Sequence, residues 1–418
     1  MTPLLFNSRY EAARILQGYL EHGAMPQHRL QPLDRDRAFI TEMVLGVVRR
    51  QYGLDWILSK LVPRRVPTGK VRPVLWVGLY QVLFMDEVEP YAAVYETVEA
   101  AKSIGTRRHA PLVNAVLRRA LRERTVLLDE LHQQPPSIRF SHPSSLLARW
   151  RTAFGEADTL RLCVWNNRKP ALLLRVRPPL SRAAALEQLL CEGIAAEPAM
   201  AHPDFIALAD MRPVAKCPGF AEGAYMVQDP ATLLAVDLLD PQPGEKIADR
   251  CAAPGGKAVA IADRLRGQGL WASDINPLRI RQLEANCRRC GYKDVQLTTF
   301  NALSDSTEQL FDGLLLDVPC SNTGVIRRRP DARYRLDEAQ LRQLTELQAA
   351  MLDQASRSVR PGGRLVYSTC SLETEENEGQ VRAWLKRHPE FELEEAAFRF
   401  PPHDQTDGAY AARLRRRR

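Results

Sequence analysis

The stretch KIADRCAAPGGKAVAIADRLR (246–266) decides the fold predicted for this chain of 418 residues. KIADR (246–250) predicts a short buried strand and AVAIADRLR (258–266) predicts a helix, with the loop CAAPGGK (251–257) between them. The alternation continues, with strands predicted at LWASD (270–274), VQLTTF (295–300), DGLLLD (312–317) and RLVYST (364–369). Strands that alternate with helices predict an α/β domain over 241–418, built on a parallel, doubly wound sheet.

Two further regions precede this domain. Residues 1–130 predict helices only, among them the nearly all-apolar PVLWVGLYQVLFM (73–85), which we expect to form a central buried helix. The pair Pro135-Pro136 then interrupts the chain. Residues 141–240 predict a small α+β subdomain, with strands at 171–179 and 205–210 and a helix at 181–193. The predicted order is therefore all-α, small α+β and α/β.

Basic charge is concentrated at the front of the chain. The whole sequence has a net charge of +8, and the first 125 residues hold 19 Lys and Arg against 12 Asp and Glu. Such an excess indicates either a solvated basic face or a surface for a polyanion, and charge alone does not decide between them. Arg118, Arg119 and Arg122 lie on neighbouring faces of one predicted helix and are candidates for RNA contacts. We expect the tail RLRRRR (413–418) to be a frayed end.

Composition excludes several classes of protein. No run of about 18 apolar residues predicts a membrane span, and the N-terminus lacks the pattern of a secretory signal. The eight cysteines are irregularly spaced, which indicates reduced thiols and a cytoplasmic location. Cys287 and Cys290 form a C-x-x-C on the apolar stripe of a predicted helix, without a second pair, so we expect no metal.

Four predicted loops converge on one place. In an open parallel sheet, ligands bind outside the carboxyl ends of the strands, where the strand order reverses. The common order 3-2-1-4-5 brings CAAPGGK, Asp274, residues 317–320 and Cys370 to one cleft. CAAPGGK matches neither the dinucleotide nor the triphosphate loop motif, and Asp274 suits ribose hydroxyls. A nucleoside cofactor without phosphates fits best, namely S-adenosylmethionine; a tight turn without a ligand is the alternative.

Two cysteines end neighbouring strands of this sheet. Cys320 follows the strand at 312–317 and Cys370 follows the strand at 364–369. A phosphatase would need C-x5-R, whereas six residues separate Cys320 from Arg327. A nucleophilic thiolate remains, and it explains how a pyrimidine could be methylated at carbon 5. Thiolate attack on carbon 6 makes carbon 5 nucleophilic, and a carboxylic acid at Asp317 would stabilise the charge that develops at ring nitrogen 3.

The sequence resembles the Sun/Fmu family of RNA 5-methylcytosine methyltransferases. The resemblance rests on CAAPGGK (251–257), DVPCSNTG (317–324), YSTCSLETEEN (367–377) and DGAYAARL (407–414), and it spans about 141–414. It implies a Rossmann-like methyltransferase domain, and the basic helical front resembles the NusB-like RNA-binding domain of one bacterial branch. That arrangement implies a monomer that modifies 16S rRNA at a site of the cytosine-967 type.

The resemblance also assigns roles to residues. Cys370 would be the nucleophile and Cys320 would help to release the product. The implied cofactor site consists of Cys251, Ala252, Ala253, Pro254, Gly255, Gly256, Lys257, Asp274, Asn301 and Asp317. Asn301 stands where an acidic residue commonly meets the adenine amino group, but its side-chain oxygen can still accept that hydrogen bond, so we expect weaker cofactor binding at most. Arg250, Ala258, Val318 and Asn322 also depart from the pattern of the family, but none removes a group that the chemistry needs.

Two other functions fit the sequence less well. A noncatalytic RNA-binding or ribosome assembly factor on a methyltransferase fold would not need both cysteines and Asp317. A DNA cytosine methyltransferase would use the cysteine of a Pro-Cys pair, and neither the second cysteine nor the basic helical region fits it. Because of the cleft beside them, we expect Arg327, Arg328 and Arg329 to meet RNA phosphates.

Overall fold

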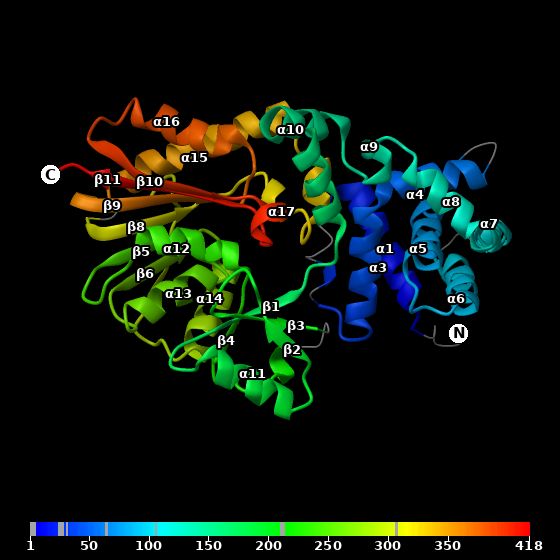
Figure 1. Ribbon diagram of the computed structural model, residues 1–418, viewed down its shortest axis with the longest axis horizontal. Coiled ribbons are helices and arrows are strands. Elements are labelled where there is room, and N and C mark those ends of the chain that lie inside the picture. The colour runs from blue at the N-terminus through cyan, green and yellow to red at the C-terminus, as the bar shows by residue number, and fades with distance from the viewer. Residues whose placement is uncertain are drawn as a thin grey trace. The chain divides into compact units, whose positions relative to one another are not determined.

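The computed structural model describes residues 6–23, 29–30, 32–62, 66–104, 107–209, 214–305 and 308–418 (Figure 1). Contacts divide the chain into two compact units. The helical unit comprises residues 1–168 together with 329–334, and the second unit comprises 169–328 and 335–418. The segment 329–334 thus leaves the second unit in the middle of its sequence and belongs to the helical one.

The described part of the helical unit is built from helices alone, as predicted. Val71–Phe84 (α5) is buried along nearly its whole length and forms the centre of the apolar core. It packs against Ser8–His22 (α1), Arg37–Arg49 (α3), Pro90–Ser103 (α6) and Ala110–Arg122 (α7). Further helices among the described residues of the unit are Gln51–Leu61 (α4), Arg124–His132 (α8), Pro136–Arg139 (α9) and Ser144–Asn167 (α10), which is kinked at Gly155. The contacts of α10 group it with the helices, although it lies within residues 141–240, over which the α+β subdomain was predicted.

The segment 329–334 is held in the helical unit by backbone carbonyl groups. The side chain of Arg333 is fully buried and donates hydrogen bonds to the carbonyl oxygens of Arg49, Phe140 and Ser141. The hydroxyl of Tyr334 donates to the carbonyl oxygen of Val48 at 2.9 Å. Burial lowers the pKa of Arg333 to about 10, so the guanidinium still carries its charge at neutral pH.

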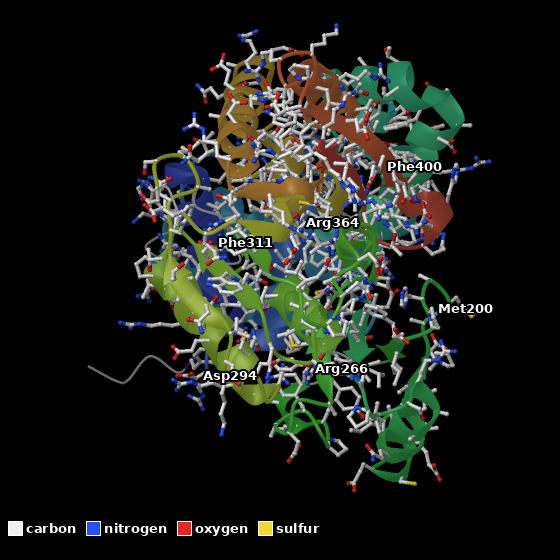
Figure 2. All side chains as sticks on the ribbon, turned by 90° about the vertical axis from the view of Figure 1, so that its left-hand side faces the viewer. Met200, Arg266, Asp294, Phe311, Arg364 and Phe400 are labelled. Carbon is white, nitrogen blue, oxygen red and sulfur yellow. The ribbon has the colours of Figure 1, made fainter. Side chains whose placement is uncertain are left out.

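The second unit contains a small antiparallel sheet of order β2-β3-β1-β4. Its strands are Leu172–Val176 (β1), Ala196–Pro198 (β2), Phe205–Leu208 (β3) and Tyr225–Val227 (β4), and Arg182–Cys191 (α11) packs on it. The α+β character predicted for this region is confirmed, although β2 and β4 were not predicted. The exposed side chain of Met200 lies on the loop between β2 and β3, away from the larger sheet that carries Phe311 and Arg364 (Figure 2).

The larger sheet has seven strands in the order β10-β11-β9-β8-β5-β6-β7. Its parallel part, Ile247–Arg250 (β5), Leu270–Asp274 (β6), Gln296–Thr299 (β7), Phe311–Asp317 (β8) and Val359–Thr369 (β9), confirms the predicted order 3-2-1-4-5. Leu233–Leu239 (α12), Gly256–Arg264 (α13) and Pro277–Arg289 (α14) cover one face, and Glu338–Ser356 (α15) and Glu378–Leu385 (α16) cover the other (Figure 1).

The expectation of a frayed C-terminal tail is wrong. Residues 413–416 continue Ala409–Arg416 (β11), which pairs antiparallel with β9 on one side and with Phe391–Arg399 (β10) on the other. Tyr410, Ala412 and Leu414 alternate into the core, while Arg413 and Arg415 pair with Glu394 on β10. The alternation of apolar and basic residues is therefore the two-residue repeat of a strand.

Candidate active site

The predicted site residues of the second unit lie at the carboxyl ends of the parallel strands of the larger sheet. Arg250 at the end of β5 is in register with Ser273 on β6 and Leu316 on β8. Asp317 at the end of β8 is in register with Ser368 on β9. The loop 251–257, Asp274, residues 317–320 and Cys370 therefore follow the carboxyl ends of four adjacent parallel strands, which is where doubly wound sheets bind their ligands.

The loop CAAPGGK is held by α14. Arg279 donates a hydrogen bond to the carbonyl oxygen of Ala253, and Asn286 Nδ2 donates to the carbonyl oxygen of Pro254 at 2.8 Å. Gly255 has a φ of 111°, and a Cβ atom there would lie 2.9 Å from Leu283 Cδ1. A side chain at residue 255 would therefore be strained in the backbone and would also push α14 away from the loop.

Three ionisable groups meet behind this loop. Lys257 Nζ lies 2.7 Å from Asp317 Oδ2. Burial acts to lower the pKa of Lys257, but the Asp317 carboxylate outweighs it and raises the pKa above its ordinary value. Asp249, in the middle of β5, is completely buried, and burial raises its pKa to about 8. Neither carboxyl oxygen of Asp249 has a hydrogen-bond partner among the described residues. Sequence reasoning missed Asp249, because an acid inside a buried strand carries no recognisable motif.

These groups fit S-adenosylmethionine, which combines a carboxylate, an ammonium group, ribose hydroxyls and an adenine ring. The Lys257 ammonium suits the carboxylate, and the unsatisfied oxygens of Asp249 suit a polar donor. Asp274 is 2% exposed, and its Oδ1 accepts from the backbone of Asn276. Its Oδ2 accepts no hydrogen bond among the described residues, although Arg279 Nη1 lies 3.2 Å away. Buried acceptors without donors favour a ligand that brings donors.

Two departures from the family pattern have structural explanations. The side chain of Asn301 accepts a hydrogen bond from the backbone of Leu303 at 3.0 Å, so its oxygen is partly engaged by its own loop. The guanidinium of Arg250 lies 3.7 Å from the centre of the Phe300 ring and donates to Ser273 Oγ. Arg250 thus stacks on an aromatic side chain at the edge of the sheet, where the family pattern has a small residue.

The two thiols are in direct contact. Cys320 Sγ and Cys370 Sγ lie 3.3 Å apart, as expected for the tips of adjacent strands. Cys320 is buried and Cys370 is half-buried. The hydrogen bond with Cys370, together with burial, raises the pKa of Cys320 well above its ordinary value. Cys320 is therefore held as a thiol beside Cys370, and the more accessible sulfur is that of Cys370.

Asn322 connects the two cysteines. Its side chain donates to the carbonyl oxygen of Cys320 at 2.7 Å, and its Oδ1 lies 3.5 Å from Cys370 Sγ. Its φ of 63° is left-handed, a conformation that asparagine tolerates better than most residues other than glycine. The asparagine at this position therefore keeps the turn and adds a polar contact to each cysteine.

A buried carboxylate holds both cysteine-bearing loops. Glu376 is completely buried and accepts hydrogen bonds from the backbone N–H of Ser321 at 2.9 Å and from its hydroxyl at 2.5 Å. It also accepts from Ser371 Oγ at 2.5 Å and from Gln348 Nε2 at 2.9 Å. Ser321 follows Cys320 and Ser371 follows Cys370, so one side chain fixes the position of both loops. The sequence motif contained Glu376 but gave no indication of this role.

Arg327 and Arg328, which were predicted to meet RNA phosphates, have acidic partners within the second unit. Arg328 lies 2.8 Å from Asp229 and 2.6 Å from Asp407, and Arg327 is buried beside the same two carboxylates. These two buried acids, Asp229 before the short helical turn 230–232 and Asp407 before β11, require cations, and the two arginines supply them. Of the three predicted phosphate ligands, Arg329 alone is exposed.

The other predicted residues lie elsewhere. In the helical unit, Arg118 and Arg122 are exposed, and Arg119 pairs with Glu123 at 2.9 Å. Cys287 and Cys290 pack in the core of the second unit. Among the described residues, no cluster of His, Cys, Asp and Glu could hold a metal ion. None of the described helices is both long enough and apolar enough to cross a bilayer.

Comparison with known proteins agrees with this architecture. Residues 236–415 match the model of the 16S rRNA methyltransferase RsmB/F family, residues 6–122 match the NusB family, and residues 142–215 match the ferredoxin-like domain of RsmF/B-like methyltransferases. The chain is 37% identical, over 98% of its own length and 98% of theirs, to the ribosomal RNA small subunit methyltransferases B of Salmonella arizonae and Salmonella typhi.

Solved structures share the fold. The crystal structure of PH0851 has a TM-score of 0.80, with 24% identity over 98% of this chain and 99% of that one. A methyltransferase homologue from Pyrococcus horikoshii has a TM-score of 0.59 and 26% identity, covering 67% of this chain and 97% of that one. With motifs, sheet order and similarity over its whole length in agreement, the chain belongs to the RsmB/F family of methyltransferases.

Proposed function

We propose that this chain transfers a methyl group to carbon 5 of one cytosine in 16S rRNA, at a site of the cytosine-967 type. S-adenosylmethionine is the cofactor of this family. The observation that carries the proposal is the pair of thiols 3.3 Å apart at the tips of β8 and β9. Methylation of an exocyclic amine or a ribose hydroxyl needs no covalent addition to the ring, whereas carbon 5 of a pyrimidine becomes nucleophilic only after a nucleophile adds to carbon 6.

The half-buried Cys370 is the nucleophile. Its thiolate forms a carbon–sulfur bond to carbon 6 of cytosine, and the electrons move towards ring nitrogen 3, which takes a proton from Asp317 in its carboxylic acid form. Lys257 holds Asp317 in place through the contact of 2.7 Å. When bound, the cofactor supplies the electrophilic methyl group that carbon 5 takes up.

Cys320 serves the last step. The proton on carbon 5 must leave before the electrons can return and expel the Cys370 thiolate. Burial and Cys370 hold Cys320 as a thiol. Once the sulfur of Cys370 is bonded to the base, Cys320 loses its hydrogen bond with a second thiol. Cys320 is then the sulfur nearest to the adduct. We assign the removal of this proton to the Cys320 thiolate, which forms when the thiol gives up its own proton to water after Cys370 has bonded to the base.

The test uses the full chain, 16S rRNA and labelled S-adenosylmethionine. Cys370→Ala should abolish methyl transfer, and Cys320→Ala should accumulate a covalent protein–RNA adduct that survives denaturing electrophoresis. Cys191→Ala is the matched control, because Cys191 is exposed and lies on α11 of the small sheet. Bisulfite sequencing of the product maps the methylated base.

Two results would contradict the proposal in different ways. If Cys320→Ala is inactive and Cys370→Ala forms the adduct, the two roles are reversed. If both variants methylate the RNA at the wild-type rate, the covalent route is wrong.

A further inference from the structure

A pocket of about 490 Å³ opens in the helical unit, away from the two cysteines in sequence and in unit. Its walls come from the end of α3, from α5, α8 and α9, and from the second half of α10. Eight of the lining residues lie beyond residue 122, where the match to the NusB family ends. The pocket is therefore not a part of that family match, and it contains none of the arginines that the sequence analysis singled out.

The lining combines five apolar or aromatic side chains with three arginines, His132 and Asn167. Arg50 stacks its guanidinium on Phe84, 4.5 Å from the ring centre, and Arg139 lies 4.8 Å from the ring centre of Phe140. Arg168 lies on the rim and is exposed. No carboxylate lines the pocket. Within the described residues, none of the three guanidiniums forms an ion pair or a hydrogen bond through its side chain.

Other arginines of the same unit have acidic partners. Arg72 pairs with Asp55, Arg124 pairs with Asp86, and Arg151 pairs with Glu156. Burial lowers the pKa of Arg50, which shows that the surroundings disfavour its charge. Three arginines without acidic partners around one apolar pocket provide a site for an anion that also has a flat, apolar part.

We infer that this pocket binds one nucleotide of a single-stranded segment of RNA. Unpaired bases stack on aromatic rings and on guanidinium planes, and arginines bind phosphates in a bidentate manner. Its volume lies in the range of pockets that bind small ligands. The inference rests on the proposed function in that RNA is the substrate, and it adds a point of attachment outside the catalytic unit.

The experiment measures RNA affinity as a function of salt with the full chain and a 16S rRNA fragment. In the double variant Arg139→Ala/Arg168→Ala, we expect binding to weaken about tenfold. The slope of log K against log salt should become less steep by roughly 0.7 for each phosphate contact that is lost. Arg161→Ala is the matched control, because Arg161 is an exposed arginine of α10 that pairs with Asp158 and does not line the pocket. It should change neither quantity.

A second measurement locates the RNA. RNA that contains 4-thiouridine should crosslink to residues 139–140 or 164–168 of the wild-type chain. Unchanged affinity and salt slope in the double variant would overturn the inference. So would a variant that binds naked rRNA normally but binds ribosomal particles weakly, because the occupant would then be a protein.

The inference and the proposed function can fail separately. If the wild-type chain binds rRNA through these arginines but forms no 5-methylcytosine, the proposed function fails and the pocket stands. If the double variant methylates the RNA and binds it as the wild type does, the pocket fails and the proposed function stands.

Discussion

Replacing Glu376 with alanine should loosen both cysteine-bearing loops at once. Four donor groups point at this buried carboxylate, from Ser321, Ser371 and Gln348. The two hydroxyls lie 3.0 Å apart and can bond to each other, so they keep a partner. The backbone N–H of Ser321 loses its acceptor, and Gln348 Nε2 loses one of its two acceptors. A buried N–H group without a partner costs about 1–3 kcal/mol, so the loss of two such hydrogen bonds costs about 2–6 kcal/mol.

Hydrogen exchange measured by mass spectrometry tests this value locally. In Glu376→Ala, the amides of peptides that cover 318–326 and 368–378 should exchange at least roughly 30-fold faster, since about 1.4 kcal/mol corresponds to a factor of ten. Glu376→Gln should have a smaller effect, because its carbonyl oxygen can still accept from both hydroxyls. Glu375→Gln is the control, because Glu375 is the exposed neighbour. Exchange within twofold of the wild type in Glu376→Ala would refute the reasoning.

Three further predictions concern the cofactor loop and the turn beside Cys370. Because the pKa of Asp249 is raised to about 8, the folded chain holds a proton there that the unfolded chain releases above its ordinary pKa. Without cofactor, the free energy of unfolding should therefore fall as pH rises from about 4 to 8, by up to about 1.4 kcal/mol per pH unit. Denaturation series at several pH values measure this slope, and Asp249→Asn should remove it. An unchanged slope in the variant would exclude Asp249 as its source. Lys257→Met removes the cation beside Asp317 and Asp249. The Kd for S-adenosylmethionine, measured by calorimetry, should therefore rise at least about tenfold. An unchanged Kd would contradict the assignment of Lys257 to the cofactor site. In Gly324→Ala the new Cβ would lie 2.7 Å from the carbonyl oxygen of Cys370 and 2.8 Å from the backbone of Gly408. Because this displaces the loop that carries Cys370, kcat should fall at least about tenfold, while the Kd for the cofactor changes less than about twofold. Equal losses in kcat and in cofactor affinity would point to general unfolding.

The sequence was sufficient to predict the parts of the site that follow from strand order. Each parallel strand ends in a short motif, and the order 3-2-1-4-5 was enough to bring Asp274, Asp317, Cys320 and Cys370 to one edge. Local patterns also predicted the central helix α5, because an apolar run of that length has no exposed face.

Long-range ion pairs were not predictable from the sequence. Arg328 is separated from Asp229 by 99 residues and from Asp407 by 79, so the sequence did not show these partners, and we predicted contacts with RNA phosphates for the run of arginines. Asp249 and Glu376 were missed for a related reason. Their roles depend on which donors surround them in the interior, and a single sequence does not show those neighbours.

The helical unit cannot complete its hydrogen bonds until Arg333 has been synthesised. The carbonyl groups of Arg49, Phe140 and Ser141 leave the ribosome long before residue 333 does, and they must stay hydrated until the arginine arrives. At about 5–20 residues per second, the delay after residue 168 is roughly ten to thirty seconds. A fragment that ends at residue 168 would carry these carbonyls without their donor. The helical unit, which is translated first, is thus completed by the later segment 329–334. Truncation of the chain at one position therefore cannot separate the two units.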